Sequence, residues 1–162
     1  MRVACCCDGD GSVELVERVL GRVGPIRALL LVHCIDLGPD RDVHLIQERL
    51  LGRQHIAERH QQAMTASEEA RAAEILGDAA AEAVQTGFGG TIESQVLHGR
   101  PEREIVHWLE TTAADAVALY PRPPARQSPA GPRSIGHVAR YIVDHAPCDV
   151  LLLRGPGPWR LR

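Results

Sequence analysis

Two glycine-containing segments and a group of arginines carry residue types that suit an anionic ligand. Residues 8–11 (Asp-Gly-Asp-Gly) follow an apolar run, and Gly136 and His137 stand near the start of a helical pattern. Glycine lets the backbone approach oxygen atoms closely, and free N–H groups at a helix N-terminus bind anions. Arginine holds phosphate through charge and paired hydrogen bonds. A phosphate could therefore be held by His137 with Arg122, Arg126 and Arg133. The alternative is that these arginines are solvated in a loop.

Cysteines are the second group that could do chemistry. Cys5, Cys6 and Cys7 are consecutive on one expected strand, Cys34 lies on its neighbour and Cys148 precedes the last strand. Alternation places Cys5 and Cys7 on one face and Cys6 on the other, so these three cannot converge on one metal. The sequence also lacks a Cys-x-x-Cys motif. Packing in the core is the simpler interpretation, and a cysteine-based redox or metal sensor is the alternative.

The elements that must position these residues alternate along the chain. Five apolar runs have the length and content of strands, at residues 2–7, 28–35, 91–98, 116–119 and 150–154. Helical patterns lie between them at residues 13–23, 67–85, 101–111 and 134–145, with a weaker candidate at 42–64. On the longest pattern the expected buried stripe is Ala73, Leu76, Ala80, Ala83 and Val84. This alternation, with mostly continuous apolar strands, predicts an α/β fold with one parallel sheet.

Length and composition fit one domain. The chain has 162 residues, of which 44% are apolar and 24% charged. We expect a single domain over residues 1–162, with a Pro- and Arg-rich loop at 121–134. The net charge of −3 argues against nucleic-acid binding, because phosphate neutralisation needs a basic surface. Since the sequence has no long apolar run and no signal-peptide pattern, we expect a cytoplasmic protein without membrane contact.

The C-terminal part of the chain carries an ordered set of motifs. Gly136 precedes a helical segment that ends in His145-Ala-Pro-Cys148, and an apolar strand follows. This order resembles the closing signature of the universal stress proteins, which has Gly-Ser, a helix, His-Ala-Pro-Cys-Pro-Val and an apolar last strand. Earlier landmarks of the same family match Asp8-Gly9, His33-Cys34, Gly99-Arg-Pro101 and Asp115-Ala-Val-Ala-Leu119. The resemblance spans essentially the whole chain.

The resemblance implies a fold and a ligand site. The fold is a three-layer α/β/α sandwich of the adenine nucleotide alpha hydrolase-like kind, with a five-stranded, mainly parallel sheet in the order 3-2-1-4-5. Ligands then lie at the carboxyl ends of strands one and four, where the strand order switches. For ATP or AMP, the implied nucleotide-binding residues are Cys7, Asp8, Gly9, Cys34, Leu119, Tyr120, Arg122, Gly136, His137, Val138 and Ala139.

The glycine motif after strand four departs from the family's pattern. That pattern is Gly, two residues, Gly, nine residues, Gly and then Ser or Thr. Here Tyr120 and Pro123 align with the first two glycines, and twelve residues separate Pro123 from Gly136. His137 replaces the Ser or Thr. Because proline lacks an N–H and has a fixed φ, a backbone loop for a triphosphate cannot form in the family's way.

These departures predict a stress-response binding or signalling module with a degraded glycine motif and no strong ATP binding. The alternative is a member that binds ATP or AMP with arginines in place of the glycine loop. The resemblance also implies a homodimer formed through the last strand, from Val150 to Arg154, and an apolar edge strand does need covering. No serine has a nucleophile–base motif around it. We therefore assign no catalytic residue and no metal, and expect at most slow ATP hydrolysis.

Overall fold

The computed structural model describes residues 1–9, 11–36, 54–121 and 135–153. Its elements in chain order are β1 (Arg2–Cys6), α1 (Ser12–Arg22), β2 (Ala28–Asp36), α3 (Gln54–Gln85), β3 (Thr91–Gly99), α4 (Pro101–Thr112), β4 (Ala116–Leu119), α5 (His137–His145) and β5 (Asp149–Leu152). The described strands form one parallel sheet in the order β3-β2-β1-β4-β5. The predicted fold class and strand order are confirmed.

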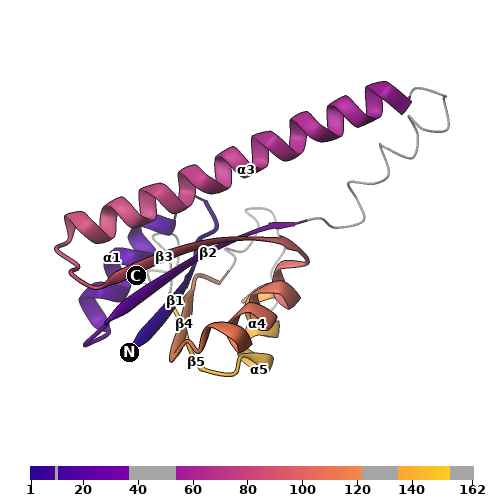
Figure 1. The fold of residues 1–162 in the computed structure, drawn as a ribbon. Helices are drawn as coiled ribbons and strands as arrows, with labels where there is room; N and C mark the ends of the chain where they lie inside the picture. Colours follow the sequence, from indigo (N-terminus) through magenta and orange to yellow (C-terminus); the bar gives the residue numbers. More distant parts are fainter. Residues whose placement is uncertain (10, 37–53, 122–134, 154–162) are drawn as a thin grey trace, which may run out of the picture.

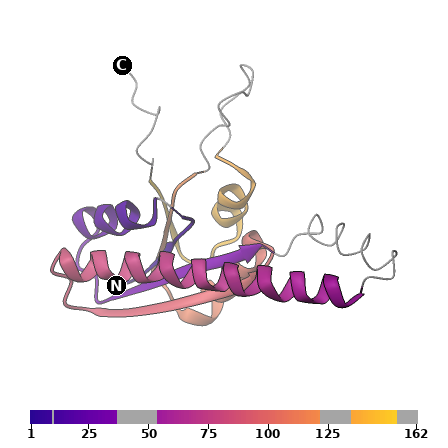
Figure 2. The same ribbon diagram turned by 90° about the horizontal axis from the view of Figure 1, so that it is seen from above.

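Helices cover both faces of the sheet, as Figures 1 and 2 show. On one face, α1 and α3 pack over a core that includes Val3 and Cys5 of β1. On the other face, α4 and α5 pack over a core that includes Ala4 of the same strand. Successive side chains of a strand point to opposite faces, so β1 contributes to both cores. This double coverage is the reason why β1, β2 and β4 are continuous apolar runs, whereas the edge strand β3 is mostly exposed.

The helix between β2 and β3 is longer than predicted. It begins at Gln54, whereas Ser67 and the acids after it indicated a start at residue 67. Residues 54–66 contain three Ala and three Gln with one Glu and one Arg, which are strong helix formers and sustain a helix without a marked apolar stripe. Residues 54–64 are helical as expected, but they belong to α3 and not to a separate helix; residues 42–53 lie outside the described ranges. Figure 1 shows α3 extending well past the sheet.

The buried stripe of α3 differs in part from the predicted one. The buried side chains of this helix are Ala72, Leu76, Ala79 and Ala83. Leu76 and Ala83 were predicted correctly, whereas Ala73 is exposed and Val84 is 64% exposed. The helix has alanines on several of its faces, so its sequence contains more than one apolar stripe with helical spacing. Packing against β2 and α1 determines which of these stripes is buried.

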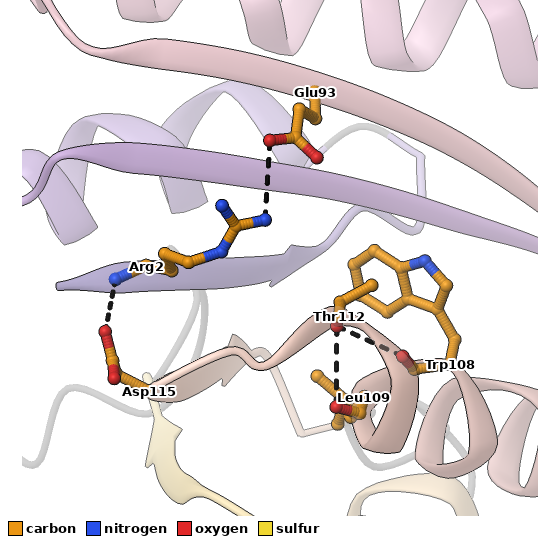
Figure 3. A network of polar contacts seen from close by, with 6 residues as sticks. All are labelled: Arg2, Glu93, Trp108, Leu109, Thr112 and Asp115. Atoms are coloured by element: carbon orange, nitrogen blue, oxygen red, sulfur yellow. Dashed lines mark hydrogen bonds and ion pairs between the residues drawn. The ribbon is translucent and has the colours of Figure 1, made fainter.

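Polar contacts tie the strands together at the amino edge of the sheet (Figure 3). The Asp115 carboxylate accepts the backbone N–H of Arg2 at 2.6 Å, and the Arg2 guanidinium lies 3.4 Å from the Glu93 carboxylate. The Thr112 hydroxyl donates to the Trp108 carbonyl at 3.1 Å and closes the last turn of α4. These contacts lie at the edge opposite to the carboxyl ends, where a ligand site is expected. None of the helices in the described ranges is long and apolar enough to cross a membrane.

Candidate functional site

The strand order switches between β1 and β4. These two strands are neighbours, yet β1 is followed in the chain by a crossover to β2 on one side and β4 by a crossover to β5 on the other. The segments that leave their carboxyl ends therefore diverge, and a crevice between them is the usual ligand position in open α/β sheets. The candidate site is this carboxyl edge of the sheet.

The turn after β1 is held in place by hydrogen bonds. The backbone N–H of Cys7 donates to the Val32 carbonyl at 2.8 Å, and Nδ1 of His33 lies 2.7 Å from the Cys7 carbonyl oxygen. The Ser12 hydroxyl donates to the Gly9 carbonyl at 2.7 Å. Gly9 has a φ of +82°, a conformation that glycine adopts without strain. The turn is thus a fixed wall of the candidate site.

Tyr120, the first residue after β4, turns its ring toward the start of α1. A Cβ placed on Gly11 would meet Cδ2 and Cε2 of Tyr120 at 3.2 Å each, so the ring lies directly against this glycine. The ring also packs against the core beneath α1 and α3. Its hydroxyl is buried, and burial raises the pKa of Tyr120, while the neighbouring Arg18 side chain acts in the opposite direction. An aromatic side chain therefore fills the space between the β1 turn and the end of β4.

The N-terminus of α5 forms another wall of the site. Gly136 caps this helix with φ +89° and ψ 160°, so only glycine fits here without strain. The first helical residue, His137, places Nε2 at 3.5 Å from a carboxylate oxygen of Glu102 in the first turn of α4. The Glu102 side chain is only 12% exposed, whereas that of His137 is 76% exposed. A nearly buried carboxylate is thus held beside the start of α5.

Carboxylates also surround the end of β2. Burial, together with the smaller effect of the negative charges of Glu104, Asp36 and Glu102, raises the pKa of the Cys34 thiol to about 12. Glu104 lies against Gly99, where its Cγ would be 2.8 Å from an added Cβ. The described rim of the site next to β2 and α4 is therefore acidic, which disfavours an anionic ligand at that side.

The structure brings most of the predicted site residues to one edge of the sheet. The residues at the strand ends and helix start around the switch point are Cys7, Asp8, Gly9, Cys34, Tyr120, Gly136 and His137. Leu119 and Ala139 are buried in the core beneath α4 and α5, and Val138 packs against the same core. Arg122, like the other arginines of the loop, lies outside the described residues.

One residue of this site, Glu102, was missed from the sequence, and one contact, that of Tyr120 with Gly11 in the turn at residues 8–11, was not predicted. Gly11 belongs to the turn after β1, but nothing in the pattern indicates that the Tyr120 ring lies on it. Glu102 had a usable signal, because the first turn of α4 follows β3 and so must lie at the same carboxyl edge. Its proximity to α5 depends on the packing of the two helices, which the sequence does not specify.

The cysteines occupy both cores and are poor nucleophiles. Cys5 and Cys7 lie under α1 and α3, and Cys6 lies on the opposite face with Cys34 and Cys148. All five are free thiols, and burial raises the pKa of each. A raised pKa lowers the thiolate fraction and therefore the reactivity. Within the described residues, no group of three or more His, Cys, Asp or Glu side chains could hold a metal ion.

An open hollow of about 620 Å³ lies away from this chemistry. It is lined by Ile26, Arg27, Phe88, Gly89, Gly90 and Thr91, at the amino edge of the sheet. The Phe88 ring packs closely over Gly90, where an added Cβ would be 2.4 Å from Cζ. The hollow lies at the edge opposite to the switch point and contains one charged side chain, that of Arg27. It does not form part of the candidate site.

Comparisons with known proteins give a family and a fold. The model of the Universal stress protein family matches residues 16–154. A universal stress protein family protein from Arabidopsis thaliana with AMP bound is 16% identical, with a TM-score of 0.61 over 97% of this chain and 93% of that one. The chain is also similar to a universal stress protein in complex with cAMP and to the universal stress protein from Archaeoglobus fulgidus in complex with dAMP. The cAMP complex is 17% identical with a TM-score of 0.56 over 96% and 98% of the two chains. The dAMP complex is 18% identical with a TM-score of 0.53 over 94% and 96%. A comparison with curated proteins gave no significant match.

Proposed function

Because the chain belongs to the universal stress protein family, we propose that it is a stress-response binding or signalling module, and not an enzyme, whose switch-point site does not bind ATP strongly. The family neighbours with AMP, dAMP and cAMP support a site for a small adenine compound in general. The proposal is that this chain keeps the position of the site and has lost the glycine loop that holds a triphosphate.

The position of Tyr120 is the observation that carries this proposal. Its ring lies on Gly11, at the place where a nucleotide-binding relative would need bare backbone between the turn after β1 and the end of β4. The loop after it adds prolines, which cannot donate backbone hydrogen bonds to phosphate oxygens. Filled space and missing donors both oppose a triphosphate.

Titration with ATP and AMP is expected to give no binding heat and no thermal stabilisation at millimolar nucleotide. A ligand that binds the native state raises the unfolding temperature only when its concentration exceeds the dissociation constant. Isothermal titration calorimetry and thermal unfolding check this result, with sodium triphosphate as the control for nonspecific anion binding. Saturable ATP binding in the micromolar range would instead support the alternative, a nucleotide-binding member that uses Arg122 and its neighbours.

We also propose that the chain forms a homodimer through β5. This strand is an edge of the sheet, and Leu152 on it is 38% exposed. The other edge, β3, presents mostly polar exposed side chains, and the Gln95 amide covers the Val96 carbonyl at 2.9 Å. An edge with such polar cover resists pairing, whereas an apolar edge favours it. Of the two edge strands, β5 is the more apolar one and is therefore the better candidate for pairing with a second chain.

Replacing Leu152 by Asp is expected to convert the dimer into a monomer, because the interface would then have to bury a charged side chain. Light scattering after size-exclusion chromatography measures the mass directly. Val84→Asp is the matched control, since Val84 is an exposed apolar residue of α3 on a helix away from β5, and this variant should remain dimeric. A monomeric wild-type protein, or equal dissociation of both variants, would contradict the proposed interface.

A further inference from the structure

We infer that Glu102 determines the ligand class of the switch-point site, by acting as a built-in anion at the start of α5 that excludes phosphate and favours an uncharged ligand such as a nucleoside. The inference rests on the proposed function, since it concerns the same site. The preference for an uncharged ligand over a phosphate depends on the charge of Glu102, whereas the Tyr120 ring acts by occupying space.

The Glu102 carboxylate lies beside the first residue of α5. It is in the first turn of α4, and its Oε1 is 3.5 Å from Nε2 of His137, the first residue of α5. The side chain is 12% exposed, so this carboxylate is held between the ends of two helices and is not free in solvent. Helices α4 and α5 pack side by side on the same face of the sheet, which keeps the two ends together (Figure 1).

A carboxylate beside a helix N-terminus competes with an anionic ligand for the same positive end. The N-terminus of a helix carries a partial positive charge and attracts one anion, which in nucleotide sites is a phosphate. Here the anion is supplied by the chain itself. A phosphate that approached α5 would meet a negative charge with little water to screen it, so the interaction that normally favours binding is offset.

Two other carboxylates near this place act in the same direction as Glu102. Glu104 and Asp36 lie close enough to Cys34 to raise the pKa of its thiol together with Glu102. Three arginines near the starts of the two helices, Arg100 before α4, Arg103 in α4 and Arg140 in α5, are all exposed, and Arg133 lies outside the described residues. Exposed cations are screened by solvent and compensate only weakly for a nearly buried carboxylate. The described walls of the site thus favour an uncharged group over a phosphate.

The experiment compares AMP and adenosine on matched variants of the full chain. Glu102→Gln removes the charge and keeps the shape. Glu110→Gln makes the same change of net charge elsewhere on α4, in an exposed residue whose carboxylate is 3.4 Å from His107. Glu102→Asp keeps the charge. Titrations followed by amide chemical shifts measure weak affinities, and thermal unfolding confirms that each variant is folded.

We expect the affinity of Glu102→Gln for AMP to rise about tenfold over the wild type, as one unit of charge near a phosphate is worth roughly that factor. Its affinity for adenosine should stay unchanged. Glu110→Gln and Glu102→Asp should bind AMP as the wild type does. Preference of the wild type for adenosine over AMP is the second expected result.

The inference is overturned if Glu102→Gln binds AMP no better than Glu110→Gln, or if its adenosine affinity rises in step with AMP. It is also overturned if none of the proteins binds either compound up to the solubility limit. These results leave the proposed function intact, because that proposal requires only weak ATP binding. Strong ATP binding by the wild type would contradict the proposed function first, so the two failures are distinguishable.

Discussion

Raising the pH from 8 to 11 is expected to destabilise the folded protein by several kcal/mol, because its cysteine thiols are buried as neutral groups. Burial raises the pKa of Cys7 from its ordinary value of 9.0 to about 12, and the pKa of Cys5 and Cys6 rises for the same reason. A thiol whose pKa is higher in the folded state stabilises the fold fully below pH 9. That stabilisation is lost as the pH rises toward 12, since only the unfolded chain ionises freely. For Cys7 alone, about two pH units at roughly 1.4 kcal/mol each give about 3 kcal/mol at pH 11.

The sequence makes this alkaline transition unusually clean. It contains eighteen arginines and no lysine, and arginine stays charged throughout this pH range. Above pH 9, the side chains that titrate are the five cysteines and two tyrosines. A loss of unfolding free energy between pH 9 and pH 12 can therefore be attributed to these few groups. The effect of a single cysteine substitution on that loss reports the contribution of that cysteine.

Urea unfolding at pH 8 and pH 11 under reducing conditions measures the effect. In Cys7→Ala, the loss between the two pH values should be about 3 kcal/mol smaller than in the wild type. Cys148→Ala is the matched control, because Cys148 is only partly buried and its removal should change the pH dependence less. Equal stability of the wild-type protein at both pH values would show that the thiols are accessible to water in the folded state.

Most of the sheet could be predicted from the sequence because its strands are covered on both faces. The run Leu29–Leu30–Leu31 is fully buried, with alternate residues in the two cores, and such a run is visible as continuous hydrophobicity. The helices were predicted less well. Where alanines occur on several sides, as in α3, periodicity alone does not identify the buried face, and contacts with β2 and α1 decide between Ala72 and Ala73.

The candidate site divides in a similar way. Topology places Asp8, Tyr120 and Gly136 at one edge, and that placement follows from the order of strands and helices. The direction of a side chain does not follow from topology. The Tyr120 ring could have pointed to either face of the sheet, and its contact with Gly11 depends on the absence of a Cβ there. The approach of Glu102 to His137 likewise results from the packing of α4 on α5.

Replacing Ile142 by Ala is expected to lower the free energy of unfolding by about 2–5 kcal/mol, the usual cost of such a cavity in a core. Ile142 is fully buried in the core that lies between the sheet and helices α4 and α5. With nine residues, α5 is too short to be stable alone, so its position depends on this packing. Urea unfolding gives the stability, and amide hydrogen exchange in α5 reports whether the helix that carries Gly136 and His137 becomes locally unstable.

Val143→Ala separates the loss of packing from the change in helix propensity. Both substitutions replace a β-branched residue by alanine in the same helix, and each gains roughly 0.5 kcal/mol of helix propensity. Val143 is 44% exposed, so it contributes little packing, and its variant should be as stable as the wild type or slightly more stable. A similar loss in both variants would mean that α5 is held by its backbone and its ends, and not by Ile142. An ion pair with an exposed partner usually contributes little to stability, and the His137 side chain is 76% exposed. A similar loss in both variants would therefore assign the Glu102–His137 pair a larger share of the stability of α5 than is usual for such a pair.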